Sequence, residues 1–187
     1  MNHRVLECFS LPDQPFRSAN LEFDYGEKEF IEQYIPTAKS AVVLKAVCES
    51  LDIDSRDRAM GLIAPYGSGK TSLFLFLCSL LEKEQKTQRA RSKILKQLEE
   101  IQPGLSSAIK ELVKPPSKGY VVVRLSGNKG SLPNAFKEGL KESLCRKTRG
   151  KGANLNLIWN KSGGDKVESQ AEIIDLYHRI SKKLKSK

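Results

Sequence analysis

The sequence predicts an α/β fold in which a parallel sheet is flanked by helices. Two short apolar runs carry this prediction, residues 59–64 (AMGLIA) and residues 120–125 (YVVVRL). The first is uniformly apolar, as in a strand buried on both faces, and the second is rich in β-branched and aromatic residues. Stretches with apolar residues at helical spacing lie around both runs. Strands that alternate with helices are typical of parallel sheets.

The length and composition predict one globular domain. The chain has 187 residues, of which 39% are apolar and 29% are charged, so a disordered or fibrous protein is excluded. We expect an irregular arm over residues 1–20, where Pro12 and Pro15 interrupt any regular pattern. The domain is then expected over residues 21–187, with a helical insertion at about 82–117.

No membrane span or secretory signal is visible. The longest apolar stretch, residues 73–81, is interrupted by Cys78 and Ser79 and is too short to cross a bilayer. The N-terminus lacks a basic start followed by an apolar run and a cleavage site. We therefore expect a cytoplasmic protein.

The cysteines give no sign of a metal site. They are scattered along the chain: Cys8, Cys48, Cys78 and Cys145. None forms a CxxC pair, and none lies near His3 or His178 at the spacing of metal ligands. We interpret them as ordinary core or surface thiols.

Two helices are predicted ahead of the first apolar run. Residues 27–34 form a short helix that stops before Pro36, because the residue before a proline is pushed out of helical geometry. Thr37 is a suitable cap for a second helix, which continues to about Leu51. Its apolar residues recur at helical spacing: Val42, Val43, Ala46, Val47 and Leu51.

A phosphate-binding loop follows the first apolar run. The candidate binding residues are consecutive: Ala64, Pro65, Tyr66, Gly67, Ser68, Gly69, Lys70, Thr71 and Ser72. Residues 64–71 match the Walker A pattern, with Ala64 in place of its first glycine. The alternative is a glycine-containing turn that merely joins a strand to a helix. The apolar run before the loop and the apolar helix after it favour binding of Mg-ATP.

Each residue type in the loop has an expected role. Gly67 and Gly69 let successive backbone N–H groups turn toward phosphate oxygens, beside the positive end of the helix that begins near Lys70. Lys70 is expected to reach the β- and γ-phosphates, and the Thr71 hydroxyl to bind Mg²⁺. Ser68 and Ser72 are expected to support the loop, whereas Tyr66 is an exposed aromatic without an assigned role.

The rest of the chain is predicted to be mostly helical. Helices are expected at residues 82–100, 106–113, 133–147 and 166–184. The first is expected to be exposed, with Ile94, Leu95 and Leu98 as a sparse apolar stripe. A loop over 150–164 is expected to hold a short strand at 157–159.

Hydrolysis needs an acid after a second buried strand, and the sequence offers none. YVVVRLSG has no acid at its end, and EIIDL at 172–176 lies within a helical pattern. The catalytic residues are therefore unknown. GNKG at 127–130 lacks the aspartate that reads guanine in GTPases, which favours ATP over GTP. Residues 23–25 are a candidate adenine site.

Two segments carry a family resemblance. RAMGLIAPYGSGKTSLFLFLCSLL and YVVVRLSGNKGSLPNAFKEGLKESL resemble the N-terminal ATPase core of large bacterial P-loop proteins, including those of BREX-type phage-exclusion systems. The resemblance covers most of residues 20–185 and implies a P-loop NTPase fold related to AAA ATPases, with further ATPase or defence-system subunits as partners. In such proteins the helix matching 166–187 is followed by the strand bearing the Walker B acids. The chain stops there, so we expect a core that is incomplete at its C-terminal end.

The charge is distributed unevenly along the chain. Residues 1–80 hold 8 basic and 11 acidic residues, whereas residues 81–187 hold 24 and 11. A basic half can attract nucleic acid, through residues 137–151 and 179–187, or can be a solvated surface without a partner.

Three functions therefore stay open. The first is an ATPase subunit of a defence or nucleic-acid-processing machine. The second is a nucleotide-sensing module that does not hydrolyse ATP, or a fragment completed by a partner. The third is a basic nucleic-acid-binding domain, against which we prefer a solvated helix face.

Overall fold

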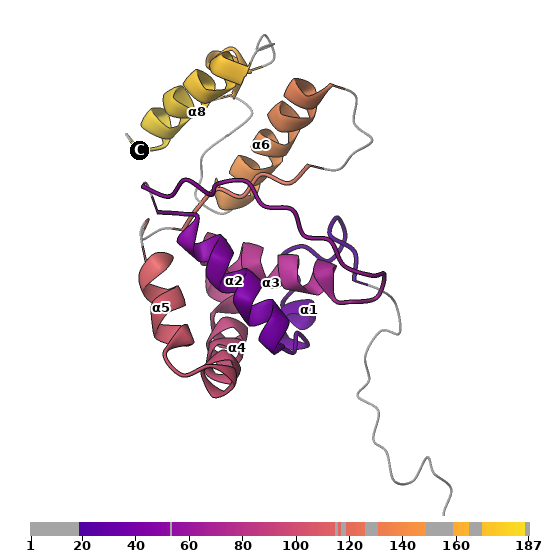
Figure 1. Ribbon diagram of the computed structural model, residues 1–187. Coiled ribbons are helices and arrows are strands. Elements are labelled where there is room, and N and C mark those ends of the chain that lie inside the picture. Colours follow the sequence, from indigo (N-terminus) through magenta and orange to yellow (C-terminus); the bar gives the residue numbers. More distant parts are fainter. Residues whose placement is uncertain are drawn as a thin grey trace, which may run out of the picture.

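The chain forms helices joined by irregular segments (Figure 1). The computed structural model describes residues 19–52, 54–114, 116, 119–125, 131–148, 159–164 and 170–185. The helices are α1 (Lys28–Glu32), α2 (Ala38–Glu49), α3 (Lys70–Glu82), the 3-10 helix η2 (Gln85–Thr87), α4 (Gln88–Ile101), α5 (Leu105–Leu112), α6 (Leu132–Thr148) and α8 (Gln170–Lys185). No strand occurs among the described residues. The predicted parallel sheet is therefore wrong for this part of the chain, and the prediction of an AAA-like P-loop ATPase, which is built on such a sheet, falls with it.

Helices α1 to α5 share one apolar core. The fully buried side chains at its centre include Ile31 of α1, Leu44 of α2, Phe76 of α3, Ile94 of α4 and Ile109 of α5. Figure 1 shows these five helices grouped together, with α6 and α8 lying next to each other beside the group. Each of the five helices contributes apolar side chains to the same core, and this packing holds α3 in position.

Several helices match the prediction closely. Thr37 caps α2 through a reciprocal pair, in which the Ser40 amide donates to Thr37 Oγ1 at 3.2 Å and the Thr37 amide donates to Ser40 Oγ at 2.8 Å. The stripe of Ile94, Leu95 and Leu98 on α4 is buried. The predicted exposure of that helix is therefore wrong on one face, because the stripe completes the core of α1 to α5.

The first predicted strand is an irregular, exposed segment. Ile63 is 98% exposed and Met60 is 48% exposed, so residues 59–64 are not a buried strand. Only Leu62 packs against the core, and it does so partly. An apolar run needs a neighbouring strand to satisfy its N–H and C=O groups, and none is present among the described residues.

The second predicted strand keeps the side-chain alternation of a strand without its ladder. Val121 and Val123 pack against a cluster formed with α6 and α8, whereas Val122 packs against Tyr25 and α3. Its hydrogen bonds go to helices: the Tyr120 amide donates to the Leu81 carbonyl at 2.8 Å. Two side chains of α6 also donate to its carbonyl groups: Ser143 Oγ donates to the Val122 carbonyl at 2.6 Å, and Lys147 Nζ donates to the Tyr120 carbonyl at 2.7 Å.

A second core joins α6 and α8. It contains Leu140, Leu144, Trp159, Ile173, Leu176 and Ile180. Trp159 is 1% exposed and lies in a short helical turn, so its end of the predicted strand at 157–159 is wrong. Residues 157 and 158, the predicted arm up to residue 18 and the GNKG segment at 127–130 lie outside the described residues.

None of the helices in the described part of the chain has both the length and the apolar character needed to span a bilayer.

Candidate phosphate-binding site

The predicted loop leads into the first turn of α3. Gly69 is the N-cap, with φ of 80°, and Gly67 has φ of 77°. Both values lie in the left-handed region that favours glycine, so these two residues are the ones that the bend requires. The first intrahelical bond is the Leu73 amide to the Gly69 carbonyl, at 2.9 Å. The loop is therefore bent as predicted, although no strand precedes it among the described residues.

Three amides at the start of α3 are free to bind an anion. Lys70, Thr71 and Ser72 are the first helical residues, and the residues four positions before them are not helical. Their N–H groups thus have no intrahelical acceptor, and no side chain caps this end of α3. Unpaired amides together with the helix dipole make a helix N-terminus attractive to negative charge.

The Lys70 ammonium is folded back onto the loop. Nζ donates to the carbonyl oxygens of Ala64 and Pro65, each at 2.7 Å, and lies 3.4 Å from Ser68 Oγ. The positive charge therefore sits at the mouth of the bend, held by uncharged acceptors. A phosphate oxygen is a stronger acceptor for an ammonium than a carbonyl is, so these partners can be exchanged for an anion.

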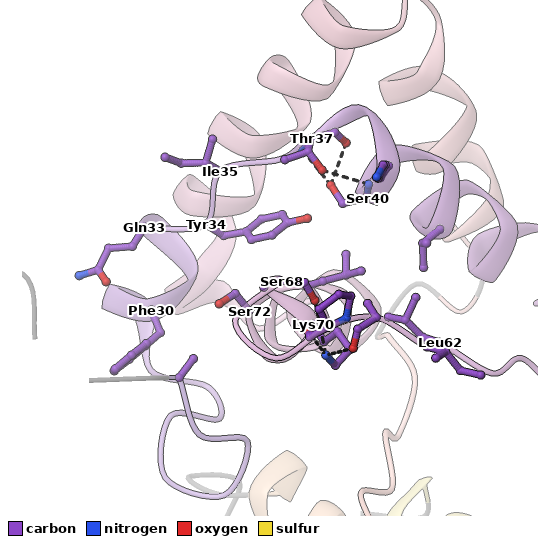
Figure 2. A pocket seen from close by; sticks show the side chains of 18 residues that line it. Phe30, Gln33, Tyr34, Ile35, Thr37, Ser40, Leu62, Ser68, Lys70 and Ser72 are labelled. Carbon is purple, nitrogen blue, oxygen red and sulfur yellow. Dashed lines mark hydrogen bonds between the residues drawn. The ribbon is translucent and has the colours of Figure 1, made fainter. Parts of the chain in front are cut away.

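A pocket of about 660 Å³ opens beside this loop. One wall consists of residues in 33–40, between α1 and the start of α2, and the other of residues 62–65 with the first turn of α3. Figure 2 shows Tyr34, Thr37 and Ser40 on one side of this space and Ser68, Lys70 and Ser72 on the other. Its volume is within the usual range for small-molecule sites.

The structure brings most of the predicted site residues to this pocket. Those that line it are Ala64, Pro65, Ser68, Gly69, Lys70 and Ser72. Tyr66, Gly67 and Thr71 do not line it. Tyr66 is 93% exposed, as its interpretation as an exposed aromatic requires, and Thr71 is half-buried in the first turn of α3.

No acid occurs among the described residues of the pocket. Neither Asp nor Glu is found there among the lining residues. The weak candidate in EIIDL lies within α8, as its helical pattern indicated, and there Asp175 accepts from Arg179 Nε at 3.1 Å. No group of three or more His, Cys, Asp or Glu side chains that could hold a metal occurs in the described part of the chain. The predicted Mg²⁺ ligand, Thr71, lies in the first turn of α3 and is not among the residues that line the pocket.

The candidate adenine site at residues 23–25 is not next to the loop. None of residues 23–25 is among the described residues that line the pocket, and Tyr25 packs against Leu75 and Cys78, which lie beyond the first turn of α3. The Tyr25 ring is covered by two guanidinium groups, Arg124 at 3.7 Å and Arg146 at 4.1 Å from its centroid. Burial, with the Cys78 thiol and the Glu82 carboxylate nearby, raises the pKa of Tyr25. This ring is a packed structural group.

Sequence reasoning missed the residues of the opposite wall. The sequence predicts Tyr34 as the last residue of one helix and places Ser40 in the first turn of the next. Nothing in this local pattern indicates that the turn between them faces the phosphate loop. The signal that could have found them is the break at Pro36, since a turn between two helices is a common place for ligand-contacting residues.

Comparisons with protein-family models, with curated protein sequences and with solved structures give no match to this chain. No family match therefore supports the predicted role in phage defence.

Proposed function

We propose that residues 64–72 bind the polyphosphate of a magnesium nucleoside triphosphate, with ATP preferred, and that this chain binds the nucleotide without hydrolysing it. The observation that carries the proposal is the meeting of three unpaired amides, of Lys70, Thr71 and Ser72, with the Lys70 ammonium at one helix start. Fixed amide dipoles and a mobile cation are complementary to a polyphosphate.

Binding requires one local rearrangement. Lys70 Nζ exchanges the Ala64 and Pro65 carbonyls for phosphate oxygens, while the glycine bend presents its amides to the same anion. A Mg²⁺ ion that arrives with the nucleotide would be held mainly by phosphate oxygens and waters, and Thr71, next to Lys70 in the first turn of α3, is the residue proposed to add its hydroxyl. The ion would neutralise part of the phosphate charge.

The lack of an acid in the pocket supports binding over turnover. A carboxylate normally holds the metal or orients the attacking water in nucleotide hydrolysis. None occurs among the described residues that line this pocket. The second of the functions predicted from the sequence, a nucleotide-sensing module, is thus the one that the site favours.

Titration calorimetry with Mg-ATP tests the proposal. We expect Lys70→Ala to weaken binding at least about tenfold, because it removes a charge-assisted contact to phosphate. Lys96→Ala is the matched control, since Lys96 is an exposed lysine on α4 outside the pocket, and it should leave the affinity unchanged. The unfolding curves of both variants show whether the fold is intact.

Two results would contradict the proposal. Absence of heat with either ATP or GTP on folded protein would remove nucleotide binding altogether. Release of phosphate well above the background of the Lys70→Ala variant would show that the chain hydrolyses the nucleotide.

A further inference from the structure

The pocket contains more than the phosphate loop needs. The loop and the first turn of α3 form only one of its walls, and the other wall comes from residues 33–40. A polyphosphate alone would contact the amides and Lys70 and would leave this second wall uncovered. What the second wall offers therefore bears on which kind of phosphate compound fits the site.

Tyr34 is the central residue of the second wall. It is 8% exposed, and its ring stacks on Phe76 of α3, with centroids 5.2 Å apart and planes 18° apart. Its hydroxyl is buried and has no hydrogen bond among the described residues. Figure 2 shows the hydroxyl directed toward the side of Ser40, across the pocket from Ser68 and Lys70. Burial raises the pKa of Tyr34, so the phenol is protonated at neutral pH and can donate.

A buried hydroxyl without a partner is unusual and unfavourable. Ser40 is close enough to lower the pKa of Tyr34, against the larger effect of burial, but its Oγ donates to the Thr37 carbonyl at 2.9 Å and accepts from the Thr37 amide, and no hydrogen bond joins it to the Tyr34 hydroxyl. The capping pair of α2 thus uses the nearest hydroxyl. A water or a ligand that reaches this hydroxyl from the pocket would supply the partner.

Apolar side chains also line this pocket, and two of them are open to solvent. Ile35 is 75% exposed and Ile63 is 98% exposed, and both line the pocket from opposite walls. Val43 and Leu62 line it more deeply. Apolar lining residues together with one hydroxyl suit an aromatic heterocycle with hydrogen-bonding atoms on its edge.

We infer that the second wall holds the nucleoside of the same nucleotide, with the base between the apolar side chains and the Tyr34 hydroxyl hydrogen-bonded to the nucleoside. This inference rests on the proposed function, because it takes the phosphates to lie at Lys70. It assigns the ligand class as a nucleoside triphosphate and excludes inorganic polyphosphate as the preferred ligand. It also replaces the base site at residues 23–25 that the sequence suggested.

The test compares Mg-ATP with magnesium tripolyphosphate on the full chain. We expect ATP to bind at least about tenfold tighter, since only ATP covers both walls. Tyr34→Phe removes one oxygen and keeps the ring stacked on Phe76. It should therefore weaken the affinity for ATP about fivefold and leave the affinity for tripolyphosphate unchanged. Without ligand this variant should be as stable as the parent or more stable, because it deletes a buried hydroxyl that lacks a partner.

A second pair of variants is matched for exposure. Ile35 and Phe23 are both 75% exposed, so truncation of either is compatible with folding, but only Ile35 lines the pocket. Ile35→Ala should weaken ATP several-fold, and Phe23→Ala should not.

The failures can be told apart. Equal affinity for ATP and tripolyphosphate, both lost in Lys70→Ala, would overturn the nucleoside subsite and leave the phosphate site standing. Loss of ATP affinity in Phe23→Ala and not in Ile35→Ala would overturn it in favour of residues 23–25. Binding of neither compound would overturn the proposed function and this inference together.

Discussion

Arg146 of α6 donates to the Glu82 carboxylate of α3 at 3.1 Å, and the two side chains are only 19% and 10% exposed. The same guanidinium lies over the ring of Tyr25. This ion pair joins helices that belong to different apolar cores. Because this ion pair is largely shielded from solvent, its removal should lower the stability of the protein measurably.

Glu82→Gln should lower the free energy of unfolding by roughly 2–3 kcal/mol, because it leaves the Arg146 charge shielded from water and without its partner. Glu111→Gln is the matched control, since it breaks a pair with Lys114 in which both side chains are 73% exposed. The control should change stability by less than about 0.5 kcal/mol. Urea unfolding measures both, and equal losses would show that the Arg146 pair contributes no more than a surface contact.

Gly119→Ala should be strongly destabilising. Gly119 has φ of +73°, and an added Cβ would clash with the Glu82 carbonyl group. Gly163 has the same φ and open space around it, so Gly163→Ala isolates the backbone strain. We expect Gly163→Ala to lower the free energy of unfolding by about 1 kcal/mol, from backbone strain alone. Gly119→Ala should lower it by at least about 2 kcal/mol more, because of the clash. Similar values at the two positions would contradict the close approach of residue 119 to the end of α3.

Thr37→Ala should cost about 1 kcal/mol of stability, because it removes the side chain that caps α2. Thr37→Gly should cost only a few tenths of a kcal/mol, since glycine is itself an acceptable N-cap. Thermal unfolding of the two variants separates them. A loss in glycine as large as in alanine would indicate that Thr37 contributes through packing and not through its hydroxyl.

Of the three thiols in the described part of the chain, two should resist alkylation and one should react. Burial raises the pKa of Cys48 from 9.0 to about 12 and that of Cys78 from 9.0 to about 11, whereas Cys145 is exposed. At pH 8.5, pulse labelling with iodoacetamide and peptide mapping should find Cys145 modified and Cys48 and Cys78 protected. In urea, Cys48 and Cys78 should react as well. Rapid labelling of Cys48 in the folded protein would contradict its burial in the core.

The same shifts set the sign of a pH effect. A thiol with a raised folded pKa contributes stability that is fully present below its unfolded pKa and is lost as the pH rises through the folded value. The contribution of Cys48 and Cys78 should therefore be intact at pH 8 and decline above about pH 9. Unfolding free energies at pH 8 and pH 10 should show this fall. An increase in stability over that interval would contradict it.

The helices were predictable because their signals are local. The cap at Thr37, the stripe of Ile94 with Leu98, and the glycine bend before Lys70 all lie within a few residues of the element they specify. The sheet was predicted wrongly because a strand exists only with a partner. Val121 to Val123 alternate as a strand does, yet the acceptors beside them are satisfied by Ser143 and Lys147 of α6.

The candidate site was half predictable for the same reason. The phosphate loop is a short continuous motif, so its residues could be named from the sequence alone. The wall that carries Tyr34 reaches the loop only because α1 and α2 pack beside α3. No spacing along the chain records that approach.

The row of valines at 121–123 has one further consequence. Because Val121 and Val123 face the core of α6 and α8 while Val122 faces α3, neither group of helices can come apart without uncovering a side of this single stretch. The two groups of helices are therefore in contact with the same three residues, and we expect them to unfold together in one cooperative step.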